Sequence, residues 1–541
     1  MKRTLSLILS LILILLCFSS CDEDSSTELY YPVTEDFTTL DPQIVSGTSS
    51  KIIAFNCYEG LVRLDENGEI AAAGASSWEV SDDALVYTFH LRQDAQWYLT
   101  NTSKEALSGD DDDSLLSESF DSRVTAKDYV FGISRALDPS TGSDGGQYLT
   151  AIKNGASVLS GDADVSQLGI EATDDYTVVI TLDYADPDFL YYLTRPAAFP
   201  CNEEFFNACR GRYGLAMEYL LCNGAYIVYR WTAGSVIRLE KNPLYTGEGQ
   251  AQNDRVWVYY VSDSDTVFDK IKDGTYDAGY VAADDGEKLK KKSGFTLNEC
   301  SDVIWGYWFN CNSEVFSVTD MRLAFACSAD KSLLSPPDYI EGETNRLLTA
   351  AMSPYFDFSP TLISYDEATA NEYFKNAINE NEDLSASITV TVLTAEDFSE
   401  SVIKQIQVWQ RVFGIDVKIK TETRENAVSL MQSGDYEIAF LPVEFSAFNT
   451  SEYFKSYVSD SAYNITAYSS EDYDSLVNSI TNSMSDDEKI SVYKECEQML
   501  ISDGVVIPAY TEASYFVQGK GVSGIYSVSE EEIYFRLGTI V

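Results

Sequence analysis

Two matching stretches decide the fold: residues 256–281, VWVYYVSDSDTVFDKIKDGTYDAGYV, and residues 416–441, DVKIKTETRENAVSLMQSGDYEIAFL. They align without a gap. Each consists of an apolar strand, a polar turn, an amphipathic helix, a glycine and a second short apolar strand. Gly274 and Gly434 follow the two helices, at a position that favours a positive φ. We therefore expect two βαβ units, each with parallel strands joined by a helical crossover.

Two similar units far apart in the chain predict two similar lobes with a cleft between them. Clefts between domains bind small ligands, and hinge closure buries the ligand. Elsewhere strand and helix patterns alternate, with strands expected at 85–92, 176–182 and 226–240 and a Thr125-capped helix over 125–137. The fold class is therefore α/β, and 541 residues are enough for two or three domains.

Composition excludes several classes of protein. The formal net charge is −49, so the chain as a whole repels nucleic acid and anionic lipid. His90 is the only histidine, it falls in an expected strand, and no C-x-x-C pair, Walker loop or G-x-S-x-G elbow is present. We expect no metal, no cofactor and no catalysis.

The first 21 residues are typical of an export signal. Lys2 and Arg3 precede a short apolar run, and Ser19-Ser20 precede Cys21. This pattern resembles a bacterial lipobox, with Phe18 and the two serines departing from the usual residues. We expect lipidation at Cys21 and a mature protein held by that anchor alone at the extracellular face of the cytoplasmic membrane.

Eight further cysteines follow Cys21 in the chain. They are scattered, without the spacing of a small disulfide scaffold, so disulfides and buried free thiols both remain open.

Six short motifs, in order along nearly the whole mature chain, resemble the family 5 extracellular solute-binding proteins, which are the peptide-binding components of ABC importers. They are Leu40-Asp41-Pro42 with Tyr58-Glu59-Gly60-Leu61-Val62; Trp78-Glu79-Val80-Ser81-Asp82-Asp83 leading to Tyr87-Thr88-Phe89-His90-Leu91-Arg92; residues 124–131; Asn223-Gly224-Ala225-Tyr226; Lys241-Asn242-Pro243-Leu244-Tyr245; and residues 320–326.

The resemblance implies a two-lobed periplasmic-binding-protein-like fold (type II, cluster C) with an extra third domain and a hinge between the lobes. Lobe I would comprise 22–58, 175–302 and 506–541, the extra domain 59–174, and lobe II 303–505. The chain would be a monomer that binds a peptide between its lobes and delivers it to an ABC permease.

The resemblance also implies where the ligand lies. Relatives pair a backbone segment after Leu-Asp-Pro with the peptide, which corresponds here to Ser46, Gly47 and Thr48. They carry Trp-x-Ala-Asp-Tyr on the other lobe, and its Asp holds the ligand's α-amine. This chain instead has Val443, Glu444, Phe445 and Ser446, so that carboxylate is missing. Phe398 and Arg424 fall at other pocket positions.

Because Ser446 carries no charge, we expect free-amine peptides not to be strongly preferred over N-blocked ones. Arg424 and the backbone of residues 46–48 would favour an anionic or uncharged end. An oligosaccharide-binding member of the family, a secreted hydrolase with paired carboxylates and a purely structural surface protein remain alternatives.

Overall fold

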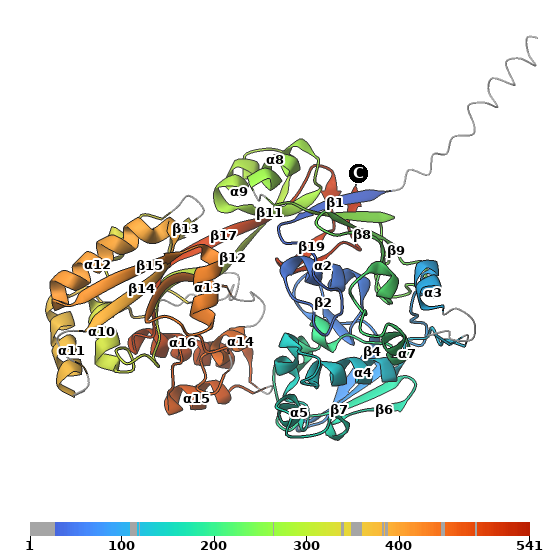
Figure 1. The fold of residues 1–541 in the computed structure, drawn as a ribbon, viewed down its shortest axis with the longest axis horizontal. Coiled ribbons are helices and arrows are strands. Elements are labelled where there is room, and N and C mark those ends of the chain that lie inside the picture. The colour runs from blue at the N-terminus through green and yellow to red at the C-terminus, as the bar shows by residue number, and fades with distance from the viewer. Residues whose placement is uncertain are drawn as a thin grey trace, which may run out of the picture.

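The computed structural model describes residues 27–540 apart from 109–115, 118, 263–264, 337–339, 348–359, 381–383, 385–387, 445–449, 462 and 482–483. Two lobes stand side by side in Figure 1, joined by two long strands, β12 (Thr296–Phe309) and β17 (Val506–Gln518). The core of the first lobe runs from Leu29 to Ala278 and returns at Phe516–Phe535. The core of the second lobe lies between Val303 and Tyr510. The fold is thus two-lobed and mixed α/β.

Two sheets organise the first lobe. One has the order β1 (Glu28–Val33), β10 (Arg255–Tyr260), β9 (Val236–Lys241) and β8 (Tyr226–Thr232), with β1 and β10 parallel. The other is antiparallel, with the order β4 (Ala75–Val80), β5 (Val86–Leu91), β7 (Thr177–Thr181) and β6 (Ile170–Asp174). Because β7 lies between β5 and β6, this sheet extends past the expected boundary at residue 174.

The smaller elements of the first lobe surround these sheets. They are α2 (Thr48–Cys57), β2 (Val62–Leu64), β3 (Ile70–Ala72), α3 (Asn101–Leu107), α4 (Ala126–Leu137), α5 (Gly155–Leu159), α6 (Phe189–Tyr192), α7 (Glu203–Ala208), α8 (Asp265–Asp273), α9 (Ala283–Lys290), β18 (Val522–Ser523), β19 (Tyr526–Ser529), β20 (Glu532–Tyr534) and β21 (Thr539–Ile540).

The second lobe is built on a sheet of order β11 (Ala278–Ala282), β17, β12, β16 (Ile438–Glu444), β14 (Thr389–Ala395) and β15 (Asp416–Glu422), with β13 (Ile340–Glu343) also paired to β17. Its helices are α10 (Thr319–Cys327), α11 (Glu367–Glu380), α12 (Ser399–Phe413), α13 (Arg424–Gln432), α14 (Thr450–Lys455), α15 (Glu471–Asn478) and α16 (Asp486–Ser502). Buried aromatic side chains fill this core, Trp305, Trp308 and Trp409 among them.

The two copies of the repeat form different structures. In the second, β15 and β16 both run parallel to β14 in one sheet, so the predicted βαβ unit is confirmed. For the first, the prediction is wrong. Its strand β10 pairs with β1 and β9, whereas β11 pairs antiparallel with β17 in the other sheet. The long strand β17 provides an edge for β11, and this pairing separates the two strands of the copy.

Local predictions agree more closely with the structure. Helix α4 begins after Thr125, and Thr125 and Asp128 form a reciprocal capping box. The expected strand at 85–92 is β5. Gly274 and Gly434 adopt φ values of 83° and 75°, the left-handed conformation expected after each helix.

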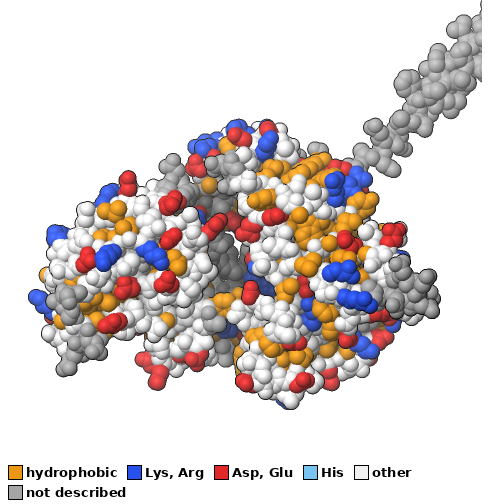
Figure 2. Space-filling view, viewed as in Figure 1, with side chains coloured by type: hydrophobic (Ala, Val, Ile, Leu, Met, Phe, Trp, Pro, Cys, Tyr) orange, Lys and Arg blue, Asp and Glu red, His pale blue; other side chains and the backbone are white. Residues whose placement is uncertain are grey.

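Two antiparallel strands make the connection between the lobes. β12 pairs with β17 along its length, with a register shift between Cys300 and Val303. Val506, Ala509 and Tyr510 belong to the second core, whereas Tyr515 and Val517 pack with Val267 and Leu289 beside the first lobe. Figure 2 shows the molecular surface hollowed between the lobes below this connection.

Candidate ligand-binding site

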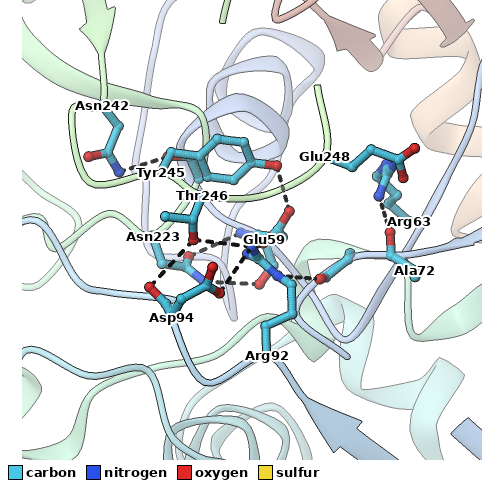
Figure 3. Close-up of polar contacts among 12 residues, drawn as sticks. Glu59, Arg63, Ala72, Arg92, Asp94, Asn223, Asn242, Tyr245, Thr246 and Glu248 are labelled. Atoms are coloured by element: carbon cyan, nitrogen blue, oxygen red, sulfur yellow. Dashed lines mark hydrogen bonds and ion pairs between the residues drawn. The ribbon is translucent and has the colours of Figure 1, made fainter. Parts of the chain in front are cut away.

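One candidate cavity lies in the first lobe and measures only about 30 Å³. Beside it, the buried Glu59 carboxylate bonds Arg92 Nη2 at 2.6 Å and Tyr245 Oη at 2.7 Å (Figure 3). Burial, and then the Glu59 charge, raises the pKa of Tyr245, so the phenol stays a donor. This volume suits one or two water molecules, so the network is a structural junction.

A second cavity, of about 70 Å³, lies where the sequence predicts ligand binding. It opens between the end of β1, the beginning of α2 and the turn before β20, and Thr48, Ser49, Tyr280 and Glu530 are among its lining residues. The carboxyl end of a strand facing a helix N-terminus is a common place for small ligands.

Gly47 shapes the beginning of α2. Its φ of 76° with ψ of 141° suits glycine, and a Cβ there would lie 2.9 Å from Glu35 Oε2. The Thr48 amide donates to the same Glu35 oxygen at 2.9 Å. Ser46, Gly47 and Glu35 are exposed, so this predicted backbone segment is accessible but already holds a carboxylate.

On the second lobe, Arg424 lies at the first turn of α13, as predicted for a strand-to-helix turn. Its Nη1 lies 3.0 Å from Glu512 Oε1 on β17, and its guanidinium lies 5.4 Å from the Trp305 ring. Trp305 Nε1 donates to the other Glu512 oxygen at 2.8 Å. Arg424 therefore stands in an ion pair rather than as an isolated positive charge.

Strand β17 links the cavity beside Thr48 to the Arg424–Glu512 pair. Tyr280, at the cavity, is paired with Phe516 of β17, and Glu512 lies four residues before Phe516 in the same strand. Four residues of strand span roughly 13 Å, the length of a short extended peptide.

The other predicted site residues are Phe398 and the run from Val443 to Ser446. Phe398 is fully buried, with its ring centroid 4.5 Å from that of Trp305, and is a core residue in this conformation. Val443 is half-buried on β16 and paired with Ile304, and the backbone of Glu444 pairs with Val303. Phe445 and Ser446 lie outside the described residues.

Sequence reasoning missed Glu35 and Glu512. The Glu35 carboxylate accepts from the backbone amide of Thr48, and the Glu512 carboxylate pairs with Arg424. Glu35 precedes Leu40-Asp41-Pro42, and Glu512 lies on the strand that returns from the second lobe. No motif indicated either residue: Glu35 lies 13 positions before Thr48, and Glu512 lies 88 positions after Arg424.

The lobes also touch directly, away from the connecting strands. Lys455 Nζ on α14 lies 2.9 Å from Asp186 and 2.6 Å from Asp188 of the first lobe. Burial opposes its charge, but Asp188 and Asp186 hold the pKa of Lys455 above its usual value. The rings of Tyr148 and Tyr463 stack across the same boundary, 5.4 Å apart.

Metal-binding and redox groups are sparse. No cluster of three or more His, Cys, Asp or Glu side chains suited to a metal occurs among the described residues. His90 lies on β5 with its Nε2 3.9 Å from Glu79. The eight cysteines after Cys21, all in the described part of the chain, are free thiols. Within the described ranges no helix has the length and apolarity needed to cross a bilayer.

The family model of the bacterial extracellular solute-binding proteins, family 5, matches residues 69–464. The chain belongs to this family. Two relatives are the dipeptide-binding protein DppE of Bacillus subtilis, 26% identical over 92% of this chain and 89% of that protein, and the probable deoxycholate-binding periplasmic protein YgiS of Escherichia coli, 24% identical over 87% and 85%.

Solved structures of the family share the fold of this member. The oligopeptide-binding protein OppA of Haemophilus influenzae, in complex with the peptide RPPGFSPFR, superposes with a TM-score of 0.72 at 21% identity, covering 95% of this chain and 99% of that one. The substrate-binding domain of a Bacillus anthracis oligopeptide ABC transporter gives a TM-score of 0.70 at 22% identity, covering 95% and 99%. The expected family and two-lobed fold are therefore confirmed.

Proposed function

We propose that this protein captures short peptides between its lobes and delivers them to the permease of an ABC importer, held at the extracellular membrane face by a lipid on Cys21. The family membership over residues 69–464 carries the proposal. The cavity beside Thr48 and the Glu512 cluster give the ligand one contact surface on each lobe.

Capture would use the backbone more than the side chains. A peptide main chain can add to exposed N–H and C=O groups as an extra strand, while hydrated pockets tolerate varied side chains. The exposed backbone at Ser46 and Gly47 is suited to this role. Closure about the register shift between Cys300 and Val303 would then bury the ligand.

Calorimetry with a matched pair of peptides, one free and one N-acetylated, tests how the ligand is anchored. We expect less than about a tenfold difference in affinity, 1.4 kcal/mol, because Ser446 replaces the carboxylate of relatives. A larger loss on acetylation would contradict this expectation. Glu35→Gln, Glu512→Gln and Glu444→Gln would then identify the carboxylate that binds the amine.

The peptide assignment has its own experiment. Mass spectrometry of molecules that copurify with the mature protein, followed by thermal shift with each, should identify peptides. A saccharide or a steroid acid that stabilises the protein where peptides do not would replace peptide as the ligand class. The deoxycholate named for one relative makes that comparison worthwhile.

The lipid anchor is tested by Cys21→Ala. The small residues before Cys21 suit signal-peptide cleavage, and the thiol is the group that would carry the lipid. The variant should appear in the medium, whereas the unchanged protein should fractionate with membranes. Retention of the cleaved variant on the membrane would contradict lipidation at Cys21.

A further inference from the structure

One face of the first lobe carries a row of aromatic and arginine side chains. On the outward side of the β1-β10-β9-β8 sheet, Tyr259 stacks with Tyr30 at 6.4 Å and with Trp257 at 6.2 Å. Arg238 lies between the Trp257 and Tyr229 rings, 5.2 Å and 4.1 Å from their centroids. We call these five residues the aromatic ladder.

The ladder is accessible over much of its length. Tyr229 is 51% exposed, and Tyr30, Arg238, Trp257 and Tyr259 are half-buried. The alternate residues Leu29, Leu239, Val256 and Val258 point the other way, into the core of the first lobe. Figure 2 shows hydrophobic and basic side chains gathered over the region where Figure 1 places β1, β8 and β9.

This face is close to neutral, unlike the chain as a whole, because two of its arginines are paired with its acids: Arg255 Nη1 lies 2.7 Å from Glu28 and Arg238 Nη2 lies 3.0 Å from Glu240. The four strands carry four basic residues, Arg230, Arg238, Lys241 and Arg255, and two acidic ones, Glu28 and Glu240. Two bordering acids, Asp254 and Asp277, accept backbone amides from Thr27 and Tyr30. In a chain of net charge −49, this sheet can approach an anionic surface with less repulsion than the rest of the molecule.

The ladder is also close to Cys21 in the sequence. Six residues separate Cys21 from Glu28, the first residue of β1. The seven steps from Cys21 to Glu28 span at most about 25 Å when the chain is extended. A lipid on Cys21 would therefore hold Tyr30 and its neighbours close to the bilayer surface.

We propose that the aromatic ladder is a membrane-facing surface that rests on the phospholipid headgroups. Tyr and Trp favour the membrane interface because their rings have apolar bodies and polar edges, and Arg binds phosphate. This contact would orient the anchored protein, with the first lobe against the membrane. The orientation rests on the proposed lipidation of Cys21, but the surface itself does not require it.

The lipid-free Cys21→Ala protein therefore provides the first test, by cosedimentation with vesicles of equal parts phosphatidylcholine and phosphatidylglycerol. We expect salt-sensitive binding that falls about tenfold in Arg230→Glu, since each basic residue near an anionic surface contributes about 1 kcal/mol. Tyr229→Ser should weaken binding in the same direction. Arg411→Glu and Tyr365→Ala on the second lobe, where the side chains are also exposed, are matched controls and should not change it.

The lipidated protein provides a second test, energy transfer from tryptophan to a dansyl-labelled phospholipid headgroup. Trp257→Phe, which keeps an aromatic ring in the ladder, should lose part of the signal. Equal transfer in both proteins, or equal vesicle binding by ladder and control variants, would overturn the proposal. Protection of the ladder from hydrogen exchange by a purified permease instead of by vesicles would also overturn it. Failure of lipidation would appear separately, as an unmodified Cys21 in the mass spectrum.

Discussion

Glu532 is a buried carboxyl group of the first lobe whose pKa is raised. Its side chain is buried, Tyr534 donates to it at 2.9 Å, and Arg195 lies 3.8 Å away. Burial raises the pKa of Glu532 to about 7, although Arg195 and Tyr534 oppose the shift and Glu531 adds to it. Near neutral pH the folded protein thus keeps a proton that the unfolded chain has lost.

This raised pKa has a testable consequence for stability. The contribution of Glu532 to the free energy of unfolding is greatest below its usual pKa of 4.5 and is lost as the pH rises through about 7. The difference corresponds to roughly 3 kcal/mol at most. Glu532→Gln should flatten that part of the pH dependence of denaturant unfolding and stabilise the protein at pH above 7. An unchanged pH profile would show that Glu532 is not protonated in the fold.

At the same scale, the candidate site was only partly predictable from sequence. The exposed Ser46-Gly47 backbone follows from a local motif, and the left-handed Gly47 explains why that position suits glycine. Phe398 was expected in a pocket, but it packs against Trp305 and Tyr510. An apolar residue at a pocket position is compatible with either environment, and only the tertiary packing decides between them.

At the scale of elements, the Glu59 network joins three segments that are distant in the chain. Glu59 follows α2, Arg92 follows β5, and Tyr245 follows β9. Asn223 adds two bonds to the Glu59 backbone, 3.0 and 3.1 Å long. The motif residues Tyr58-Glu59-Gly60 and Leu91-Arg92 therefore have a structural explanation, since they hold the segment after α2 and the end of β5 against the segment after β9.

This junction predicts a stability effect without a binding effect. Glu59→Gln removes one charge from a pair in which Arg92 is largely buried, and it should lower the free energy of unfolding by about 2–4 kcal/mol. Glu66→Gln, an exposed residue seven positions later, is the control and should change it little. Ligand affinity should stay unchanged in both. A loss of affinity in Glu59→Gln at full folding would assign the network to the ligand site.

The repeat illustrates what periodicity can and cannot predict about elements. It identified β10, α8 and β11 as well as β15, α13 and β16 in their correct order. It did not predict that β11 would leave its own unit and pair with β17. Strand patterns report which face of a strand is buried, whereas the partner along its edge depends on segments elsewhere in the chain.

At the scale of the whole molecule, two kinds of contact determine how the lobes are placed relative to each other. The paired strands β12 and β17 connect them continuously, and bending at the register shift would change the angle between the lobes. The Lys455 ion pairs and the Tyr148–Tyr463 stack form only when the lobes are close. The first kind would permit motion, and the second stabilises the arrangement in which the lobes touch.

The contact between Lys455 and its two aspartates can be tested by removing the lysine. Lys455→Ala would leave Asp186 and Asp188, both largely buried, facing each other without their cation. Like charges in such a site repel, so the closed arrangement should lose stability relative to an open one. We expect the ligand affinity to fall about tenfold, 1.4 kcal/mol, because part of the binding energy must restore closure.

Small-angle scattering should show a larger radius of gyration for the Lys455→Ala variant with and without ligand. Lys420→Ala removes a half-buried lysine whose ion pair among the described residues is with Asp435 of the same lobe, and it should change neither measurement. Adding Asp186→Asn and Asp188→Asn to Lys455→Ala should recover much of the affinity, since the repulsion is then gone. If the single variant kept both its affinity and its radius of gyration, the contact would have no role in closure.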